Sequence, residues 1–180
     1  MTTPATSRRS LLCRRRGEAD FDCWGMVVGA ALRLDDYIHP GLVGLLGLWE
    51  ARRHGARPPD FGDIRLVELR PWLDHVGLVE VERAPVRFRI HLNGAALARF
   101  QGRDASGHYL DEIAPAAERR SVLLPYHACA ATGGAVFDRV RFRLPGAVGV
   151  LLNRLLLPFR RGGDEIDIIV AALFADQRLH

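Results

Sequence analysis

FRIHLNGAALARFQGRDASG, residues 88–107, changes its hydrophobic period halfway along. Phe88, Ile90 and Leu92 alternate with polar residues, which predicts a strand with one buried face. In the second half apolar residues recur at helical spacing instead, and Gly102 ends that repeat. The stretch therefore predicts an amphipathic strand that leads directly into a short helix and a polar loop.

The residues before this stretch extend the strand into a hairpin. An alternating run at 76–82 precedes it, and only a short turn separates the two strands. This pairing places the acidic residues Glu80 and Glu82 opposite Arg87 and Arg89. Opposite charges across two strands stabilise a hairpin modestly, so we expect this side of the hairpin to face solvent.

The residues after this stretch supply a longer helix and more strands. A helix is expected within 116–134, where Pro125 kinks it or delays its start and a glycine pair stops it. An earlier helical segment must end or bend at Pro71 for the same reason. Further strands are expected at 136–144, 148–159 and 165–174.

This order of elements defines the fold class. Strands joined by tight turns pair antiparallel, and their shared apolar side must be covered. We therefore expect an α+β fold with a five-stranded antiparallel sheet and helices on one face, preceded by an N-terminal amphipathic helix. The expected parts are an N-terminal extension at 1–40 that is poorly ordered or partly helical, a leader helix and Pro-rich loop at 41–74, and the sheet domain at 75–176.

The leader helix carries a narrow apolar stripe. Leu42, Leu45, Leu46 and Trp49 follow helical spacing, and Gly55 ends the segment. The glycines within the helix lower its intrinsic stability, so the stripe must be buried against something. It packs either on its own domain or on a second copy, and we favour a homodimer through helix 42–54.

The distribution of charge and the number of cysteines indicate which partners and which cellular compartment to expect. The net charge of +4 comes from an arginine-rich start, because residues 1–16 hold five arginines and no acid. The other 20 arginines are balanced by 21 acidic residues, so we expect no nucleic-acid or membrane partner. Three cysteines without a paired motif support neither a disulfide framework nor a zinc site, which favours a reducing cytoplasm.

The order of elements and the segment 88–107 resemble the PAS sensory-domain superfamily. Asn93 and the small residues after it, the apolar Leu97 and Phe100, and the turn at 102–107 carry this resemblance. The preceding residues 48–81 resemble the leader of small stand-alone bacterial PAS proteins, in which an arginine often stands at the position of His91.

The resemblance implies a sensor that encloses a small apolar or amphipathic ligand between sheet and helices, and that acts by association rather than by catalysis. No kinase, cyclase or DNA-binding segment is recognised, so we expect signal transduction through a partner protein. The residues expected to contact the ligand are Phe88, Ile90, Phe100, His108, Tyr109, Tyr126, His127 and Phe142.

Two cofactors are considered because of the resemblance. Some PAS domains hold haem through a histidine on the long helix, where His127 lies, although an ordinary helix histidine is the favoured interpretation. Flavin photochemistry requires a reactive cysteine in the loop after the first short helix. Residues 102–112 contain no cysteine, so that chemistry is rejected.

Other functions are weighed against the sensor. A small cone-shaped α+β enzyme acting on an apolar ligand would need an inward carboxylate, and Asp138 is the candidate for it. The loop residues Ser106, His108 and Asp111 are interpreted as turn and cap residues rather than a catalytic triad. Nucleic-acid binding would use a ladder of arginines, but a solvated sheet face is favoured; the ladder consists of Arg87, Arg89, Arg139, Arg141 and Arg143.

Overall fold

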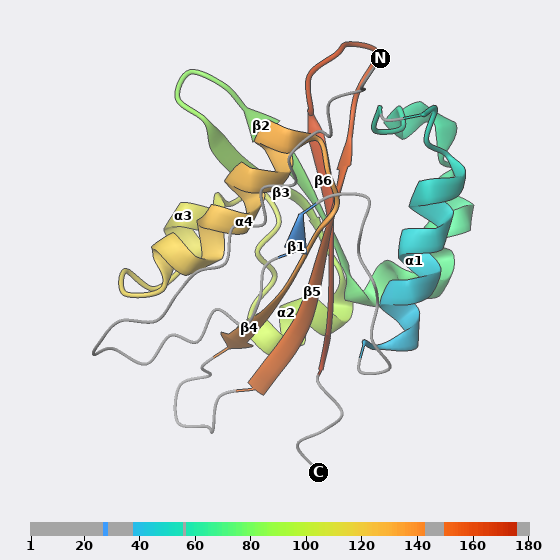
Figure 1. Ribbon diagram of the computed structural model, residues 1–180. Coiled ribbons are helices and arrows are strands. Elements are labelled where there is room, and N and C mark those ends of the chain that lie inside the picture. The colour runs from blue at the N-terminus through green and yellow to red at the C-terminus, as the bar shows by residue number, and fades with distance from the viewer. Residues whose placement is uncertain (1–26, 29–37, 56, 143–149, 176–180) are drawn as a thin grey trace, which may run out of the picture.

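The computed structural model describes residues 27–28, 38–55, 57–142 and 150–175 (Figure 1). Its elements follow the predicted order, with one additional short strand near the N-terminus. In chain order they are β1 (Val27–Val28), α1 (Pro40–Ala51), the 3₁₀ helices η1 (Phe61–Asp63) and η2 (Leu66–His75), β2 (Val76–Glu82), β3 (Arg87–Asn93), α2 (Ala95–Gln101), α3 (Leu110–Ile113), α4 (Arg119–Thr132), β4 (Val136–Phe142), β5 (Val150–Phe159) and β6 (Ile168–Ala175).

The described strands form one antiparallel sheet in the order β1-β4-β5-β6-β2-β3. The predicted five-stranded antiparallel sheet is therefore confirmed. The additional strand β1 lies beside β4, with Val27 opposite Phe137. Most of the expected extension at 1–40 lies outside the described residues.

The β2–β3 hairpin has the predicted register. Glu80 lies opposite Arg89, and Glu82 lies opposite Arg87. The ion pairs of these side chains are made elsewhere, however, because Arg87 pairs with Asp111. The hairpin is thus fastened to α3 by the charges that were expected to stabilise the hairpin itself.

A β-bulge in β3 changes the face to which its side chains point. Leu78 of β2 pairs with Leu92, whereas the next residue, Val79, pairs with Ile90, so His91 is the extra residue on β3. Ile90 belongs to the core on one side of the sheet, whereas Leu92 lies opposite Leu78, which packs against the core on the other side. The strict alternation expected for the strand at 88–92 could not predict this change.

The sheet is covered on both faces (Figure 1). We call the face covered by α1 and η2 the leader face; its core includes Trp49, Leu157 and Phe174. We call the opposite face, covered by α2, α3 and α4, the cavity face; its core includes Phe88 and Tyr126. The helices between β3 and β4 lie on one face, as predicted, and the leader helix packs on the other.

Helix α1 is held on the sheet by its apolar stripe and by its ends. Leu42, Leu45 and Trp49 are almost completely buried. The indole Nε1 of Trp49 donates a hydrogen bond to the carbonyl of Pro158 at 2.9 Å. At the N-terminus, Nδ1 of His39 accepts from the backbone N–H of Gly41, which caps the helix.

The burial of this stripe limits how a dimer could form. The stripe belongs to the core of its own chain, so it cannot also be the seam between two copies. A homodimer through helix 42–54 stays a prediction, and it would have to use the outer side of α1. Val43, which is 43% exposed, lies on that outer side.

Two prolines lie inside helices rather than ending them. Pro71 lies within η2, which continues to His75. The prediction that the helix ends at Pro71 is therefore wrong, and the alternative that it bends there remains. Pro125 lies within α4, which starts at Arg119, and Pro125 therefore does not delay the start of the helix. Within α4, the side chain of Pro125 is buried.

Candidate functional site

A cavity of about 340 Å³ lies on the cavity face, between the sheet and α2, α3 and α4. Most of its wall is apolar. Val79, Ile90 and Leu173 line it from the sheet, and Leu97, Leu110 and Val122 line it from the helices. A hollow of this kind can bury a small molecule, because an apolar ligand replaces water that the wall binds poorly.

Two of the eight residues predicted to contact a ligand line this cavity, namely Ile90 and Tyr126. Phe88 is buried beside them, where its ring centroid lies 5.5 Å from that of Tyr126 and 4.8 Å from that of His127. Phe88 is therefore part of the packing behind the cavity wall, and it does not line the cavity.

The other predicted residues lie elsewhere. His108 and His127 are exposed, Phe100 and Tyr109 are half-buried, and none of these four lines the cavity. The side chain of Phe142 lies outside the described residues.

Several lining residues escaped the sequence analysis. Gln101 and Arg103 line the cavity from the end of α2, and Arg154 lines it from the middle of β5. Arg154 interrupts a continuous apolar run of sequence, and such an interruption was the available signal, because a buried strand carries a charge only where that charge has a partner. For Gln101 and Arg103 the sequence carried no comparable signal.

The partner of Arg154 is Asp138. The two residues lie directly opposite each other on β4 and β5, and only 3% and 5% of their surfaces are exposed. Arg154 donates from Nε to Oδ1 of Asp138 at 2.8 Å and from Nη2 to Oδ2 at 2.5 Å. Its Nη1 also donates to the carbonyl of Val122 at 3.2 Å, which ties α4 to the sheet.

The ion pair with Arg154 determines whether Asp138 can act as a catalytic base. Asp138 points inward, as the enzyme hypothesis required, but both of its carboxylate oxygens accept from Arg154. Asp138 also does not line the cavity. A carboxylate that is held in this way is not placed to remove a proton from a molecule in the cavity.

Two further groups on this face, Tyr126 and Cys129, are held in their neutral forms. Burial raises the pKa of Tyr126 to about 12, against the opposing charge of Arg154. Burial alone raises the pKa of the Cys129 thiol far above its ordinary value. A thiol that is not ionised is a poor nucleophile and a poor metal ligand, so Cys129 is a packing residue.

The end of α2 forms the polar part of the cavity wall. Asn93, the last residue of β3, donates from Nδ2 to Oε1 of Gln101 at 2.8 Å. Gly102 ends the helix with a φ of 71°, which leads the chain to Arg103. Gly94 is required for a different reason, because a Cβ there would lie 2.4 Å from the carbonyl oxygen of Leu73 in η2.

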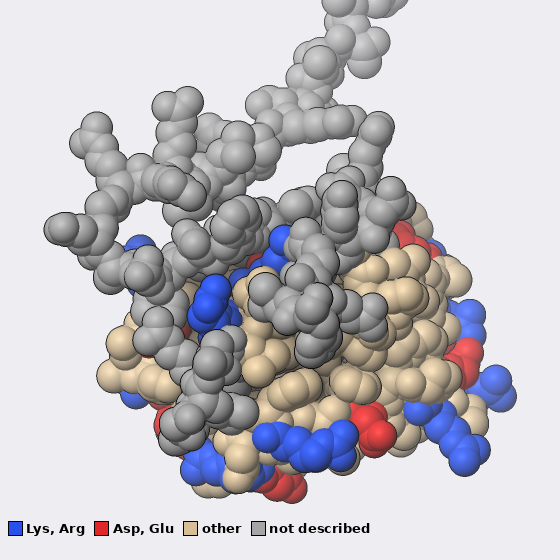
Figure 2. All heavy atoms as spheres, turned by 90° about the horizontal axis from the view of Figure 1, so that it is seen from below, with Lys and Arg blue, Asp and Glu red and all other residues tan. Residues whose placement is uncertain are grey.

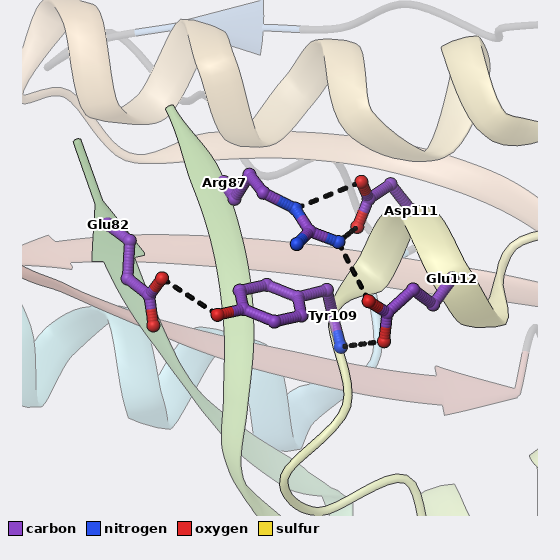
Figure 3. A network of polar contacts seen from close by, with 5 residues as sticks. All are labelled: Glu82, Arg87, Tyr109, Asp111 and Glu112. Atoms are coloured by element: carbon purple, nitrogen blue, oxygen red, sulfur yellow. Dashed lines mark hydrogen bonds and ion pairs between the residues drawn. The ribbon is translucent and has the colours of Figure 1, made fainter. Parts of the chain in front are cut away.

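Helix α3 is fixed by a network that we call the α3 network, shown in Figure 3. Arg87 donates from Nε and Nη2 to the carboxylate of Asp111, at 3.1 and 2.8 Å, and from Nη2 to Glu112 at 2.9 Å. Its guanidinium lies 3.6 Å from the ring centroid of Tyr109, whose hydroxyl donates to Glu82 at 2.9 Å. The network therefore joins the β2–β3 hairpin to the start of α3.

The charges within the α3 network stabilise one another. Hydrogen bonds from Arg87 lower the pKa values of Asp111 and Glu112, and the carboxylate of Glu82 raises the pKa of Tyr109. The network positions α3, whose residues Leu110 and Ile113 line the cavity. The network therefore holds α3, a helix of only four residues, in place as part of the cavity wall.

The side chains do not fit a haem held by His127. His127 is exposed and does not line the cavity, and the lining residues include neither histidine nor cysteine. Within the part of the chain that the structure describes, no group of three or more His, Cys, Asp or Glu residues could hold a metal ion. The cavity wall therefore offers neither histidine nor cysteine as an axial ligand for haem iron.

The arginines considered for nucleic-acid binding do not form one surface. Arg87 lies on β3, at the far side of the sheet from the β4 residue Arg139, and it belongs to the α3 network. Arg139 donates to Asn153 at 3.3 Å, and Arg143 lies outside the described residues. Along the lower and right-hand edges of the face shown in Figure 2, basic and acidic side chains lie near one another.

None of the described helices is both long enough and apolar enough to cross a bilayer.

An antiparallel sheet with helices folded over an apolar cavity is typical of small sensory and regulatory domains. The family model described as PAS domain matches residues 38–174, a range that includes α1 as well as the sheet. The chain therefore belongs to the PAS domain family, and the predicted resemblance is confirmed. The leader helix is part of the matched module rather than an addition to it.

Two further comparisons found a weak similarity and no match, respectively. It is similar to a solved RNA-binding light-oxygen-voltage receptor, with 19% identity, a TM-score of 0.44, and coverage of 66% of this chain and 35% of that chain. The chain thus spans about a third of that receptor's length, and at this similarity the receptor's ligand and partner are not transferred to it. No curated protein matches the chain.

Proposed function

We propose that this PAS domain is a sensory module that binds a small apolar or amphipathic molecule in the cavity and signals by changing its association with another protein. The observation that carries this proposal is the cavity itself. Its volume of about 340 Å³ lies at the lower end of the range of ligand sites, and its wall is apolar with a few polar groups.

Strand β6 provides a physical route from the cavity to the opposite face. Leu173 lines the cavity, and the next residue, Phe174, lies on the leader face. The Phe174 ring is stacked between His39 and His75, with centroid distances of 4.1 Å on each side. A displacement of Leu173 by a ligand would therefore reach the start of α1 through directly packed residues.

The leader face carries exposed apolar residues on its outer side, which suits a change in association. Val43 on α1 is 43% exposed, and Leu66 and Val67 on η2 are 60% and 61% exposed. Exposed apolar side chains of this size are common in protein contacts. This supports a protein partner or a second copy on the leader face.

Native mass spectrometry of the purified chain tests the proposal, with spectra taken before and after denaturation. The expected result is an additional organic mass that leaves on denaturation. Ala171→Ile, which extends a side chain into the cavity, should prevent retention of that mass while the protein stays folded. Ala172→Ile is the matched control, because Ala172 is the next residue on β6 and belongs to the leader-face core.

The contradicting result is equally clear. If Ala171→Ile retains the same organic mass as the unmodified chain, the molecule does not occupy this cavity. If the spectra show no organic mass that leaves on denaturation, the proposed binding of a small molecule in this cavity is contradicted.

A further inference from the structure

We infer that the ligand of this cavity is an amphipathic monocarboxylate, whose apolar chain lies along the sheet and whose carboxylate is held at the end of α2 by Gln101 and Arg103. This inference rests on the proposed function and specifies the chemistry of the ligand. It follows from the distribution of the polar groups around the cavity and from which of them are already occupied.

Most charged groups of the wall are not available to hold a ligand. Arg154 is engaged by Asp138 and by the carbonyl of Val122. Arg141 lines the cavity from β4, which β5, β6 and β2 separate from β3 and from the end of α2. These two arginines therefore do not supply the head-group site.

The end of α2 presents hydrogen-bond donors. Oε1 of Gln101 accepts from Asn93, and this bond leaves the Nε2 amide group of Gln101 as the end that can donate to a ligand. Arg103 lines the same cavity, is exposed, and makes no hydrogen bond or ion pair with any residue that the structure describes. Two neighbouring donors, one of them charged, favour a ligand group that only accepts, such as a carboxylate.

The acidic residue of the cavity wall limits the ligand to one negative charge. Glu118 lines the cavity from the start of α4, and a second carboxylate placed there would be repelled. Asp104 does not line the cavity; it accepts from the backbone N–H and the hydroxyl of Ser106, and Asn93 also donates to it. Hydrogen bonds from Ser106 hold the pKa of Asp104 below its usual value. The carboxylate of Asp104 is therefore stabilised by its own loop, outside the cavity wall.

The volume sets the size of the ligand. A water molecule in the liquid occupies about 30 Å³, so a cavity of about 340 Å³ holds on the order of a dozen non-hydrogen atoms. Decanoate has that size, with an apolar chain for the wall of Val79, Ile90 and Leu173. Decanol and decylamine have the same chain with a neutral and a cationic head group.

Isothermal titration calorimetry of the full chain with these three probes tests the inference. Decanoate should bind about tenfold more tightly than decanol, and decylamine should bind most weakly, because Arg103 attracts only the carboxylate. Arg103→Gln should remove the preference for decanoate and leave the affinity for decanol unchanged. Arg99→Gln is the matched control, since Arg99 is an exposed arginine on α2 that does not line the cavity.

The outcomes separate this inference from the proposed function. If decanol binds as tightly as decanoate, and Ala171→Ile weakens both, the cavity is a ligand site but the monocarboxylate assignment is overturned. If Arg103→Gln and Arg99→Gln reduce decanoate binding equally, the preference is a general effect of charge and the head-group site is overturned. If none of the probes binds, the inference is overturned, while the mass-spectrometric search still tests the proposed function.

Discussion

The leader face and the cavity face of one sheet differ in how they are filled. On the leader face, large side chains such as Trp49, Phe159 and Leu157 are almost completely buried against one another. On the cavity face, small residues such as Ala105 and Ala171 and the buried Arg154 border a hollow of about 340 Å³. Unfilled volume costs stability, so the tightly packed face supports a fold whose other face is left open for a ligand.

The largest expected effect comes from the buried ion pair on the cavity face. Asp138→Asn leaves Arg154 buried without its counter-charge, which should lower the free energy of unfolding by about 3 kcal/mol. Chemical denaturation measures the loss. The double variant Asp138→Leu/Arg154→Met removes both charges and should recover most of it, and a double variant as unstable as the single one would show that the loss is not electrostatic.

The next effect compares the same substitution on the two faces. Leu45→Ala on the leader face should cost about 4 kcal/mol, because it opens a new hollow in a packed core. Leu110→Ala should cost about 2 kcal/mol, because Leu110 borders an existing cavity and has fewer partner atoms to lose. Equal losses in denaturation experiments would contradict the difference between the faces.

The α3 network gives a smaller, local effect. Arg87→Gln removes its hydrogen bonds to Asp111 and Glu112 and the contact with Tyr109, so α3 should open more often. Hydrogen exchange at residues 110–114 should then become several-fold faster, with little change on the leader face. Arg89→Gln, the neighbouring exposed arginine of β3, is the control and should leave this exchange rate unchanged.

The smallest effect is a pH dependence on the leader face. Burial, followed by the nearby His75, lowers the pKa of His39 below 6.5, so the unfolded chain binds a proton at a pH where the folded chain does not. Stability should therefore fall as the pH drops from about 6.5 towards the lower folded-state pKa. His39→Asn keeps a capping side chain and should remove this part of the pH dependence; an unchanged profile would contradict the role of His39.

The sequence was informative wherever a pattern is local. Alternation predicted the β2–β3 register, and helical spacing predicted the buried stripe of α1. The sequence could not predict whether the apolar stripe of α1 packs on the chain's own sheet or on a second copy, because either surface would bury Leu42 and Trp49 equally well. The bulge at His91 of β3 likewise leaves no mark in the alternation of the strand's residues.

The candidate site was harder to predict than the fold. Ile90 was placed correctly because strand alternation fixes its side, and Tyr126 was placed on the inward stripe of α4. His127 follows Tyr126 by about 100° of helix rotation and therefore points outward. Arg103 lies in a loop, where no periodicity indicates which side chains reach a cavity formed by distant strands.

One measurement tests the difference between the two faces most directly, namely the free energies of unfolding of Ala171→Ile and Ala172→Ile. Both residues are buried neighbours on β6, and they face opposite sides of the sheet. Ala171→Ile should change the free energy of unfolding by less than about 0.5 kcal/mol, because the added atoms enter the cavity, whereas Ala172→Ile should lower it by about 1–3 kcal/mol through overpacking. Equal losses for the two variants would show that the cavity face is as tightly filled as the leader face, and would contradict the account.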